Sequence, residues 1–309
     1  NSKIFDQFLK NRNIIQQRIY QKVGNEGANG KTNYVNKSSA DVLIPAFYAA
    51  YMDRDAATTD LKFVHEGNVK NILSSLIPNW KVTCDALMKV NGVKKNFKSF
   101  NLNHTYKSTY NIGAYESLNE WTRMYGSDYG VYGENEDFDY ITSRYDVATV
   151  SISEQFAPLF GVDASLKNSL SFKFEVKKSR NVQLDIPGNQ ILESASMEYV
   201  VGSGYRFDDI GLIIKVGKSQ KKVKNDLNLR GDIGFKNTDA YIRVIDDEYS
   251  QLSSGLRALT LKFSADYVLS ERLNVKLYYD CKSSTPKVSD GYPTISSDFG
   301  IAFKINLTR

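Results

Sequence analysis

Few side chains in this sequence have the types and spacing that enzymatic chemistry needs. The chain has two histidines, His65 and His104, and two cysteines, Cys84 and Cys281. His104 falls on an apolar position of an alternating segment, which predicts a packed histidine and not a catalytic one. The sequence contains no Gly-x-Ser-x-Gly motif, no His-Glu-x-x-His motif and no phosphate-binding loop. We therefore expect no enzyme activity and no cofactor.

The acidic segment 134–139 and the two cysteines are the remaining candidates for metal or redox chemistry. The segment reads ENEDFD. It is rich in carboxylates but lacks the glycine and the ligand spacing of a calcium-binding EF-hand loop, so we expect a solvated loop and no metal site. Cys84 and Cys281 fall on apolar positions of segments that are not consecutive neighbours. We expect two free thiols and no disulfide.

Composition excludes helical membrane proteins but not membrane proteins that span the bilayer as β-barrels. The longest uncharged apolar stretch in the 309 residues is 42–52, which is far shorter than the roughly 20 residues that a membrane-spanning helix needs. Barrel strands, in contrast, are only half apolar and escape this test. The net charge of +5 is small and the charges are interspersed. We expect no nucleic-acid partner.

From about residue 80 onward, apolar and polar residues alternate with a period of two. In one run Phe172 and Phe174 alternate with Lys173 and Glu175, as on a strand with one apolar and one polar face. About eleven such runs follow one another with short breaks, which predicts antiparallel neighbours. Several runs are longer than the roughly 5–6 residues of an ordinary strand. Aromatic residues such as Phe156 recur near the run ends, as membrane-interface girdles require, although the ordinary strand propensity of aromatic residues predicts the same.

Residues 1–79 differ from the rest of the chain. Apolar spacing predicts a short helix over 3–10, and the Gly/Asn/Ser-rich segment 24–40 predicts a loop. Asp41 precedes a second helix near 41–52 that is apolar all round, so we expect it to be buried in protein. Residues 1–79 are thus expected to form an insertion of loops and short helices with room for one strand, followed by antiparallel barrel strands over 80–309 that end in a C-terminal closing strand.

Two all-β architectures fit the alternation: a soluble sandwich or lipocalin-like barrel, and an outer-membrane barrel. The long runs favour the membrane barrel, and so does the sorting of the connections. Outer-membrane barrels have short turns at the periplasmic end and long loops outside. Counting back from the C-terminus predicts inward turns at 91–96, 157–160, 186–190, 236–239 and 269–272. It predicts outward loops at 118–145, 167–169, 208–221, 246–256 and 283–296, of which only 167–169 is short.

The last run supplies a further sign. Asp298, Gly300, Phe303 and Ile305 fit the pattern polar-x-Gly-x-x-apolar-x-apolar, which is similar to the C-terminal insertion signal of outer-membrane barrels. Its physical sense is an edge strand with which the assembly machinery can pair before closure. On the other runs, the polar positions are expected to line a hydrated lumen; they include Lys173, Lys177, Lys224, Arg230, Lys262 and Lys276.

Several stretches of the sequence resemble the C-terminal region of the SprA/Sov family, the outer-membrane translocon of the type IX secretion system. The resemblance covers most of residues 41–309 in order and includes loops as well as strands. It is carried by Asp41–Tyr51, Ile77–Leu87, Phe97–Tyr115, Val150–Asp163, Lys167–Asn181, Gly202–Asp208, Lys224–Arg230, Phe263–Asp280 and Thr285–Leu307.

The resemblance implies that this chain is the C-terminal piece of a much longer protein in the outer membrane of a Gram-negative bacterium, linked to protein secretion and gliding motility. About 11–12 of its strands would form part of the wall of a far larger barrel. The implied partners are the remainder of the same barrel chain, a lipid-binding PorV-like partner barrel, a periplasmic plug, outer-membrane lipid, and cargo with a C-terminal sorting domain. The alternative is a self-contained 12-stranded outer-membrane barrel, either porin-like or adhesin-like or a barrel enzyme.

Overall fold

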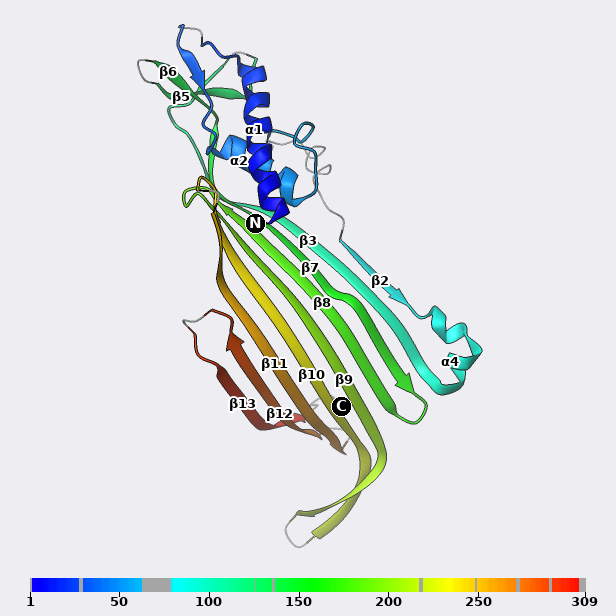
Figure 1. Cartoon of the computed structure of the whole chain (residues 1–309). Helices are drawn as coiled ribbons and strands as arrows, with labels where there is room; N and C mark the ends of the chain where they lie inside the picture. Colours follow the sequence, from blue (N-terminus) through cyan, green and yellow to red (C-terminus); the bar gives the residue numbers. More distant parts are fainter. Residues whose placement is uncertain are drawn as a thin grey trace.

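A large antiparallel sheet of nine strands forms the main part of the molecule (Figure 1). The computed structural model describes residues 2–27, 30–62, 79–124, 126–134, 137–216, 219–247, 249–270, 273–288 and 291–305. The strands of the large sheet are β2 (Trp80–Cys84), β3 (Phe97–Ser117), β7 (Tyr145–Leu166), β8 (Leu170–Asp185), β9 (Gln190–Val216), β10 (Ser219–Val244), β11 (Tyr249–Ser270), β12 (Leu273–Pro286) and β13 (Thr294–Ile305).

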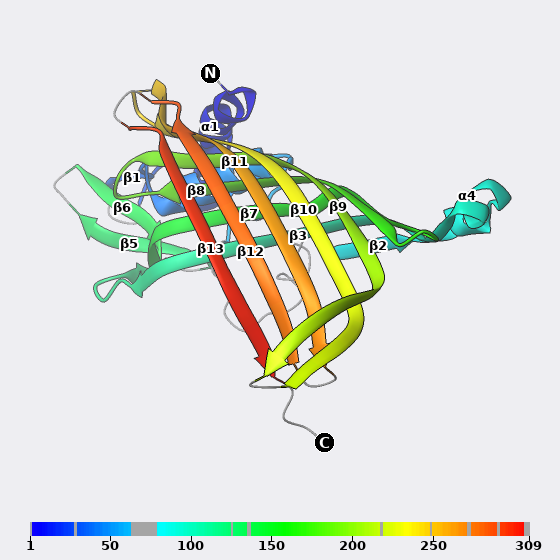
Figure 2. The ribbon, with the colours of Figure 1, turned by 90° about the horizontal axis from the view of Figure 1, so that it is seen from below.

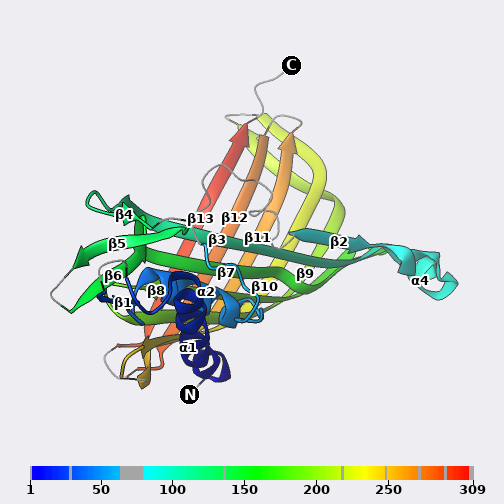
Figure 3. The ribbon, with the colours of Figure 1, turned by 90° about the horizontal axis from the view of Figure 1, so that it is seen from above.

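The strands lie in the order β13-β12-β11-β10-β9-β8-β7-β3-β2, so each pairs with its neighbour in this series. Every pair is antiparallel. Figures 2 and 3 show that the sheet is twisted and curled, since β10 to β13 run across the direction of β3, β7 and β8. The predicted all-β, antiparallel class is confirmed. None of the helices in the described segments is long and apolar enough to cross a bilayer.

The large sheet has nine strands where the sequence predicts about eleven, because two expected breaks lie inside strands. The expected turn 157–160 is a bulge in β7, where the register with β8 shifts between Phe156 and Phe160. Pro158 has no N–H to donate, and a proline within a strand is confined to an edge or a bulge. The expected turn 236–239 pairs without interruption with both β9 and β11.

The predicted sorting of loops is therefore wrong in part. The expected outward loop 208–221 belongs largely to β9 and β10, which end at Val216 and begin at Ser219. Turn 186–190, which was expected on the inward side, lies at the same end of the sheet as segment 118–144. The tight turn 167–169, which was expected on the outward side, lies at the end where β13 finishes. The expected turn 269–272 falls partly outside the described residues. The longer connections 118–144 and 287–293 share one end of the sheet.

Near the N-terminus, the structure contains longer helices than the sequence suggests. The predicted helix 3–10 continues through α1 (Lys3–Val23), because Ile15, Ile19 and Val23 extend its buried stripe. It ends at Gly24, whose φ of 76° suits glycine. The second helix, α2 (Ala40–Tyr51), is buried nearly all round as predicted. The predicted run that starts at residue 80 leaves the strand after Cys84 and continues as η1 (Ala86–Lys89) and α4 (Asn91–Asn96).

A second, four-stranded sheet joins the two helices. Its order is β1-β6-β5-β4, and segment 118–145, expected as an outward loop, supplies three of its strands. The bounds are β1 (Thr32–Tyr34), β4 (Thr122–Arg123), β5 (Tyr129–Glu134) and β6 (Phe138–Ser143). Asp41 in α2 accepts hydrogen bonds from Thr142 Oγ1 at 2.7 Å and Ser143 N at 2.9 Å. We call α1, α2 and this sheet the N-terminal body.

The N-terminal body packs on one face of the large sheet, at the end opposite α4 (Figure 1). Fully buried side chains from both parts form one apolar cluster, and burial of each large one stabilises the contact by about 1.5–3 kcal/mol. The helices contribute Phe5, Phe8, Ile15 and Phe47, and the large sheet contributes Val150, Ile152, Val182, Leu184 and Ile191. Arg12 in α1 adds an ion pair to Asp246, 3.0 Å away, in the connection between β10 and β11.

The buried carboxyl of Asp41 makes the stability of the N-terminal body dependent on pH. Desolvation raises the pKa of Asp41 above its ordinary value of 3.8, against the opposing hydrogen bonds from Thr142 and Ser143. The folded state therefore binds more protons than the unfolded state, and the free energy of unfolding falls as the pH rises above 3.8. We expect Asp41→Asn to flatten this slope when thermal unfolding is followed by circular dichroism over a pH series. The exposed Asp53→Asn is the matched control, and an unchanged slope in Asp41→Asn would contradict the assignment.

Candidate functional site

The residues that could have supported catalysis do not come together. His104 packs among aromatic rings, with ring centroids 6.3 Å from Trp80 and 5.9 Å from Phe156, and its Nδ1 lies 2.6 Å from the Leu159 carbonyl oxygen. This confirms the packed histidine. His65 lies outside the described residues. Within the described segments, no three His, Cys, Asp or Glu side chains gather as metal ligands.

The acidic segment and the cysteines also have structural surroundings. Asp139 is buried and lies 4.0 Å from Lys31, so the expectation of a fully solvated loop is wrong at this position. Glu136 lies outside the described residues. Cys84 in β2 and Cys281 in β12 are free thiols, as predicted. Six strands of the sheet lie between them.

The large sheet has two chemically different faces, because its register aligns residues of neighbouring strands in transverse rows. One row on the polar face joins Lys173, Asp232, Lys262, Asp280 and Asp298 through consecutive Cα pairings, with Gly202 between the first two. Opposite charges directly across a strand pair stabilise the sheet, while the Asp280–Asp298 pair at β13 repels. Further along the same face, Lys177 bridges Glu175 at 3.4 Å and Glu198 at 3.8 Å.

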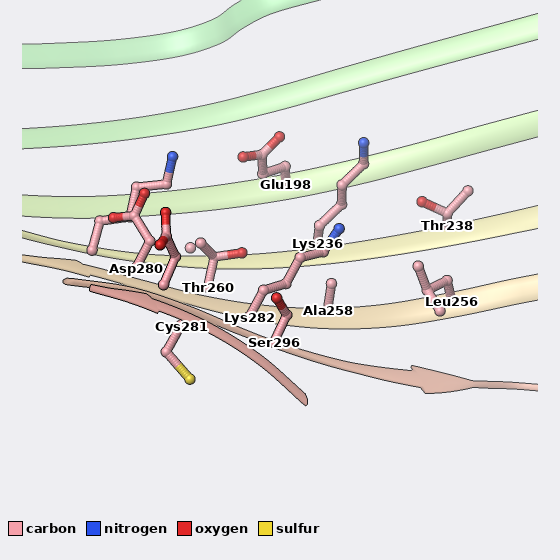
Figure 4. Close-up of a pocket in the computed structure, with 13 residues that line it drawn as sticks. Glu198, Lys236, Thr238, Leu256, Ala258, Thr260, Asp280, Cys281, Lys282 and Ser296 are labelled. Atoms are coloured by element: carbon pink, nitrogen blue, oxygen red, sulfur yellow. The ribbon is translucent and has the colours of Figure 1, made fainter. Parts of the chain in front are cut away.

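The polar face is hollowed over strands β9 to β13. A concave space of about 510 Å³ lies there, and charges of both signs line it, among them Glu198, Lys236, Asp280 and Lys282. Figure 4 shows Glu198, Lys236 and Lys282 reaching into this space, while Cys281 points to the other side of the sheet. Mixed charges of this kind keep water on the surface and give a partner no single complementary charge.

The structure places most of the predicted polar residues on this one face. Lys173, Lys177, Arg230, Lys262 and Lys276 share it by register. Lys224, exposed, has the same strand parity as Arg230 but lies beyond the register shift between Asn225 and Leu227. The expectation that this face lines a hydrated lumen stays a prediction.

The opposite, apolar face is exposed over the middle of the sheet. Neighbouring rows hold large apolar side chains, of which Val201, Ile233 and Phe263 are 55%, 51% and 50% exposed. On β13 the apolar positions run from Ile295 to Ile305, a length of about 33 Å at 3.3 Å per residue. At the usual strand tilt of about 40° this length spans about 25 Å, the height of the apolar band of an outer-membrane barrel. A soluble protein rarely exposes a continuous apolar surface of this extent.

A row of aromatic, polar and basic residues ends the apolar band on the side of the N-terminal body. The register aligns its members across eight strands, from β2 to β12. The Tyr106 ring stacks on Trp80 at 4.4 Å and meets Phe156 at 4.7 Å. We call this set the boundary row; it consists of Trp80, Tyr106, Phe156, Lys178, Met197, Asn237, Arg257 and Thr285.

Sequence reasoning missed the boundary row because both strand faces are polar there. The run from Lys236 to Asp239 has polar residues at both parities, which resembles a turn, yet the strand continues through it. The same holds for Lys177 to Asn181 in β8. The sequence does contain a sign of the boundary row, namely two such polar runs in different strands. That they lie at the same height becomes visible only when the register is known.

The two edges of the sheet are open among the described residues. No described strand pairs with the free side of β2 or of β13, and these two strands do not pair with each other. All four residues of the predicted insertion signal lie in β13. Gly300 lies beneath the ring of Tyr278 on the neighbouring strand, so that a side chain at this position would displace the ring, an arrangement in which an aromatic ring covers an edge glycine.

A scan against protein-family models finds no match, and a search of curated proteins finds no similar sequence. The function must therefore be inferred from the two faces of the sheet, its open edges and the boundary row.

The two faces predict opposite labelling patterns for engineered cysteines. In a background with Cys84 and Cys281 changed to alanine, we expect Lys173→Cys and Lys262→Cys to react with a membrane-impermeant thiol reagent in whole cells. Their strand neighbours Phe174→Cys and Phe263→Cys should stay unlabelled, because they would face lipid. Mass shift on a gel measures the labelling. Reaction at the two phenylalanine positions with none at the lysine positions would reverse the assignment of the faces.

Proposed function

We propose that the chain is the C-terminal wall segment of an outer-membrane translocon of the type IX secretion system, and that it conducts folded cargo proteins across the outer membrane. The observation that carries the proposal is a two-faced sheet of nine strands, most of them long, whose two edges are unpaired among the described residues. An apolar outer surface with a polar concave surface suits a barrel wall. Open edges expose unpaired backbone groups, which lipid does not tolerate. Further strands must therefore complete the wall.

The polar face has the chemistry of a conduit for folded proteins. Lysines and carboxylates alternate across the strands, as in the row of Asp232, Lys262 and Asp280. Such a charged surface favours hydration over adhesion to a folded protein, because adhesion is promoted by continuous apolar patches. Transport then needs width and weak contacts, and no chemical step. The resemblance to the SprA/Sov family adds the cargo class, proteins with a C-terminal sorting domain.

The open strand β13 and its exposed apolar residues suit contact with other parts of such a machine. Phe299 and Phe303 are 70% and 65% exposed at this edge. Edge strands pair readily with further strands. The partners that the proposal assigns near this wall are the remaining strands of the same protein, the lipid-binding PorV-like barrel and the periplasmic plug.

Site-specific photocrosslinking in actively secreting cells tests the conduit. We expect a photoreactive amino acid at Lys236 or Lys262 to capture exported proteins that carry a C-terminal sorting domain. The matched positions Phe235 and Phe263, on the same strands but the opposite face, should capture none. Crosslinking to cargo that is equal at both faces, or absent from both while export continues, would contradict the proposal.

Refolding of the isolated chain separates the proposal from a self-contained barrel. In detergent, we expect residues 1–309 alone to give no heat-modifiable, protease-resistant species, because no described strand pairs with the free side of β2 or of β13. A compact, heat-modifiable band from the isolated chain would instead favour the small closed barrel.

A further inference from the structure

The boundary row contains two cations that the structure leaves without a partner among the described residues. Lys178 in β8 and Arg257 in β11 are both exposed, and neither makes an ion pair or side-chain hydrogen bond to a described group. They lie on the apolar face, because Lys178 pairs in register with Phe156 and Met197, and Arg257 with Asn237 and Thr285. No member of the boundary row is acidic.

The carboxylates nearest to these two cations are already neutralised. Between the boundary row and the helices, the apolar face carries three acidic side chains, each with its own basic partner. Arg180 contacts Glu154 at 2.5 Å, Arg243 contacts Glu193 at 2.8 Å, and Lys287 reaches Asp239. Lys178 and Arg257 therefore represent an uncompensated positive charge on this part of the surface.

The position of Lys178 and Arg257 along the strands determines what kind of ligand could bind them. On one side of the boundary row lies the exposed apolar band, with Val176 and Leu259 two residues away along the strands. On the other side, Arg180 Nη2 donates a hydrogen bond to the Tyr51 carbonyl oxygen at 3.1 Å, so the N-terminal body begins there. A ligand must thus be apolar below and anionic at the level of the cations, which describes a membrane lipid with a phosphorylated headgroup.

We propose that Lys178 and Arg257 bind lipid headgroup phosphates at the rim of the apolar band, beneath the N-terminal body. The two residues lie three strands apart, or roughly 14 Å at the usual strand spacing, which is too far for a single phosphate. Each cation therefore holds its own phosphate. The long side chains lay their methylene groups along the apolar band and extend their charged ends to the headgroup level. Arg257 can in addition bind a phosphate through two parallel N–H donors.

This inference rests on the proposed function, since it requires the apolar face to lie in a bilayer. The stacked rings of Trp80, Tyr106 and Phe156 support it independently of charge, because aromatic residues concentrate at the same interface in membrane barrels. The boundary row thus combines an aromatic half, on β2 to β7, with a basic half, on β8 to β11.

Lipid retention by the full-length protein tests the proposal. The protein is reconstituted in nanodiscs of phosphatidylcholine containing a minor fraction of phosphatidic acid, which exposes a phosphate monoester, and the retained phosphatidic acid is counted by native mass spectrometry. We expect Lys178→Gln with Arg257→Gln to weaken retention by about fivefold for each cation removed. The control pair, Lys173→Gln with Lys262→Gln, removes two positive charges from the same two strands but on the polar face. This pair should leave retention unchanged.

Further arms separate the alternatives. Lys178→Arg with Arg257→Lys keeps the charges and should retain the lipid, which attributes a loss in the glutamine pair to the missing charge. An unchanged thermal unfolding curve of the glutamine pair excludes misfolding as the cause. Lipid headgroup binding would be overturned if both glutamine pairs lost phosphatidic acid equally, or if neither lost any. Full competition by inorganic phosphate alone would also overturn it. So would the loss of a co-purifying protein while lipid retention stays intact. Recovery of the full-length protein in the soluble fraction would refute the proposed function itself, whereas a membrane protein with unchanged retention would refute only this inference.

Discussion

The residue-by-residue register of the antiparallel sheet is the constraint on which the rest of the structure depends. Because each strand pairs residue by residue with the next, the alternation within one strand is copied across the sheet into rows. A single shift by one residue would exchange the two faces of a strand. The irregularities in the sheet, such as the bulge in β7 opposite Lys178, keep the apolar residues Phe156 and Phe160 on the same face. The two chemically distinct faces are therefore a property of the whole sheet.

The N-terminal body uses one of these faces at one end only. Val182, Leu184 and Ile191 lie on the same face as Phe174 and Val201, yet they are fully buried beneath the helices while the other two are exposed. The apolar face thus has two kinds of neighbour: protein at one end, and whatever surrounds the molecule over the middle. Arg180 and Arg243 occupy the transition, where their ion pairs with Glu154 and Glu193 allow charged groups to be partly buried.

The boundary row gives physical meaning to this transition. Below it, apolar side chains remain exposed over a length of strand that suits the hydrocarbon thickness of a bilayer. Above it, the N-terminal body covers the sheet and forms its own polar contacts, as in the hydrogen bonds from β6 to Asp41. On the apolar-band side of the boundary row, the polar face carries paired charges such as Lys177 with Glu175 and Glu198. In the proposed function, the apolar face would lie outside and the polar face inside a wide protein-conducting barrel.

The sequence alone determined the strand class, the two faces and the buried helix. Period-two alternation is a local property, and so are the apolar composition of α2 and the terminal motif from Asp298 to Ile305. Strand count and loop sides were not determined, because a polar run such as Lys236–Asp239 has the composition of a turn whether or not neighbouring strands pair with it. The boundary row and the common apolar cluster of the N-terminal helices and the large sheet were decided by the tertiary structure alone. They join residues far apart in the chain, and only the register of the folded sheet brings Trp80, Lys178 and Arg257 to the same height.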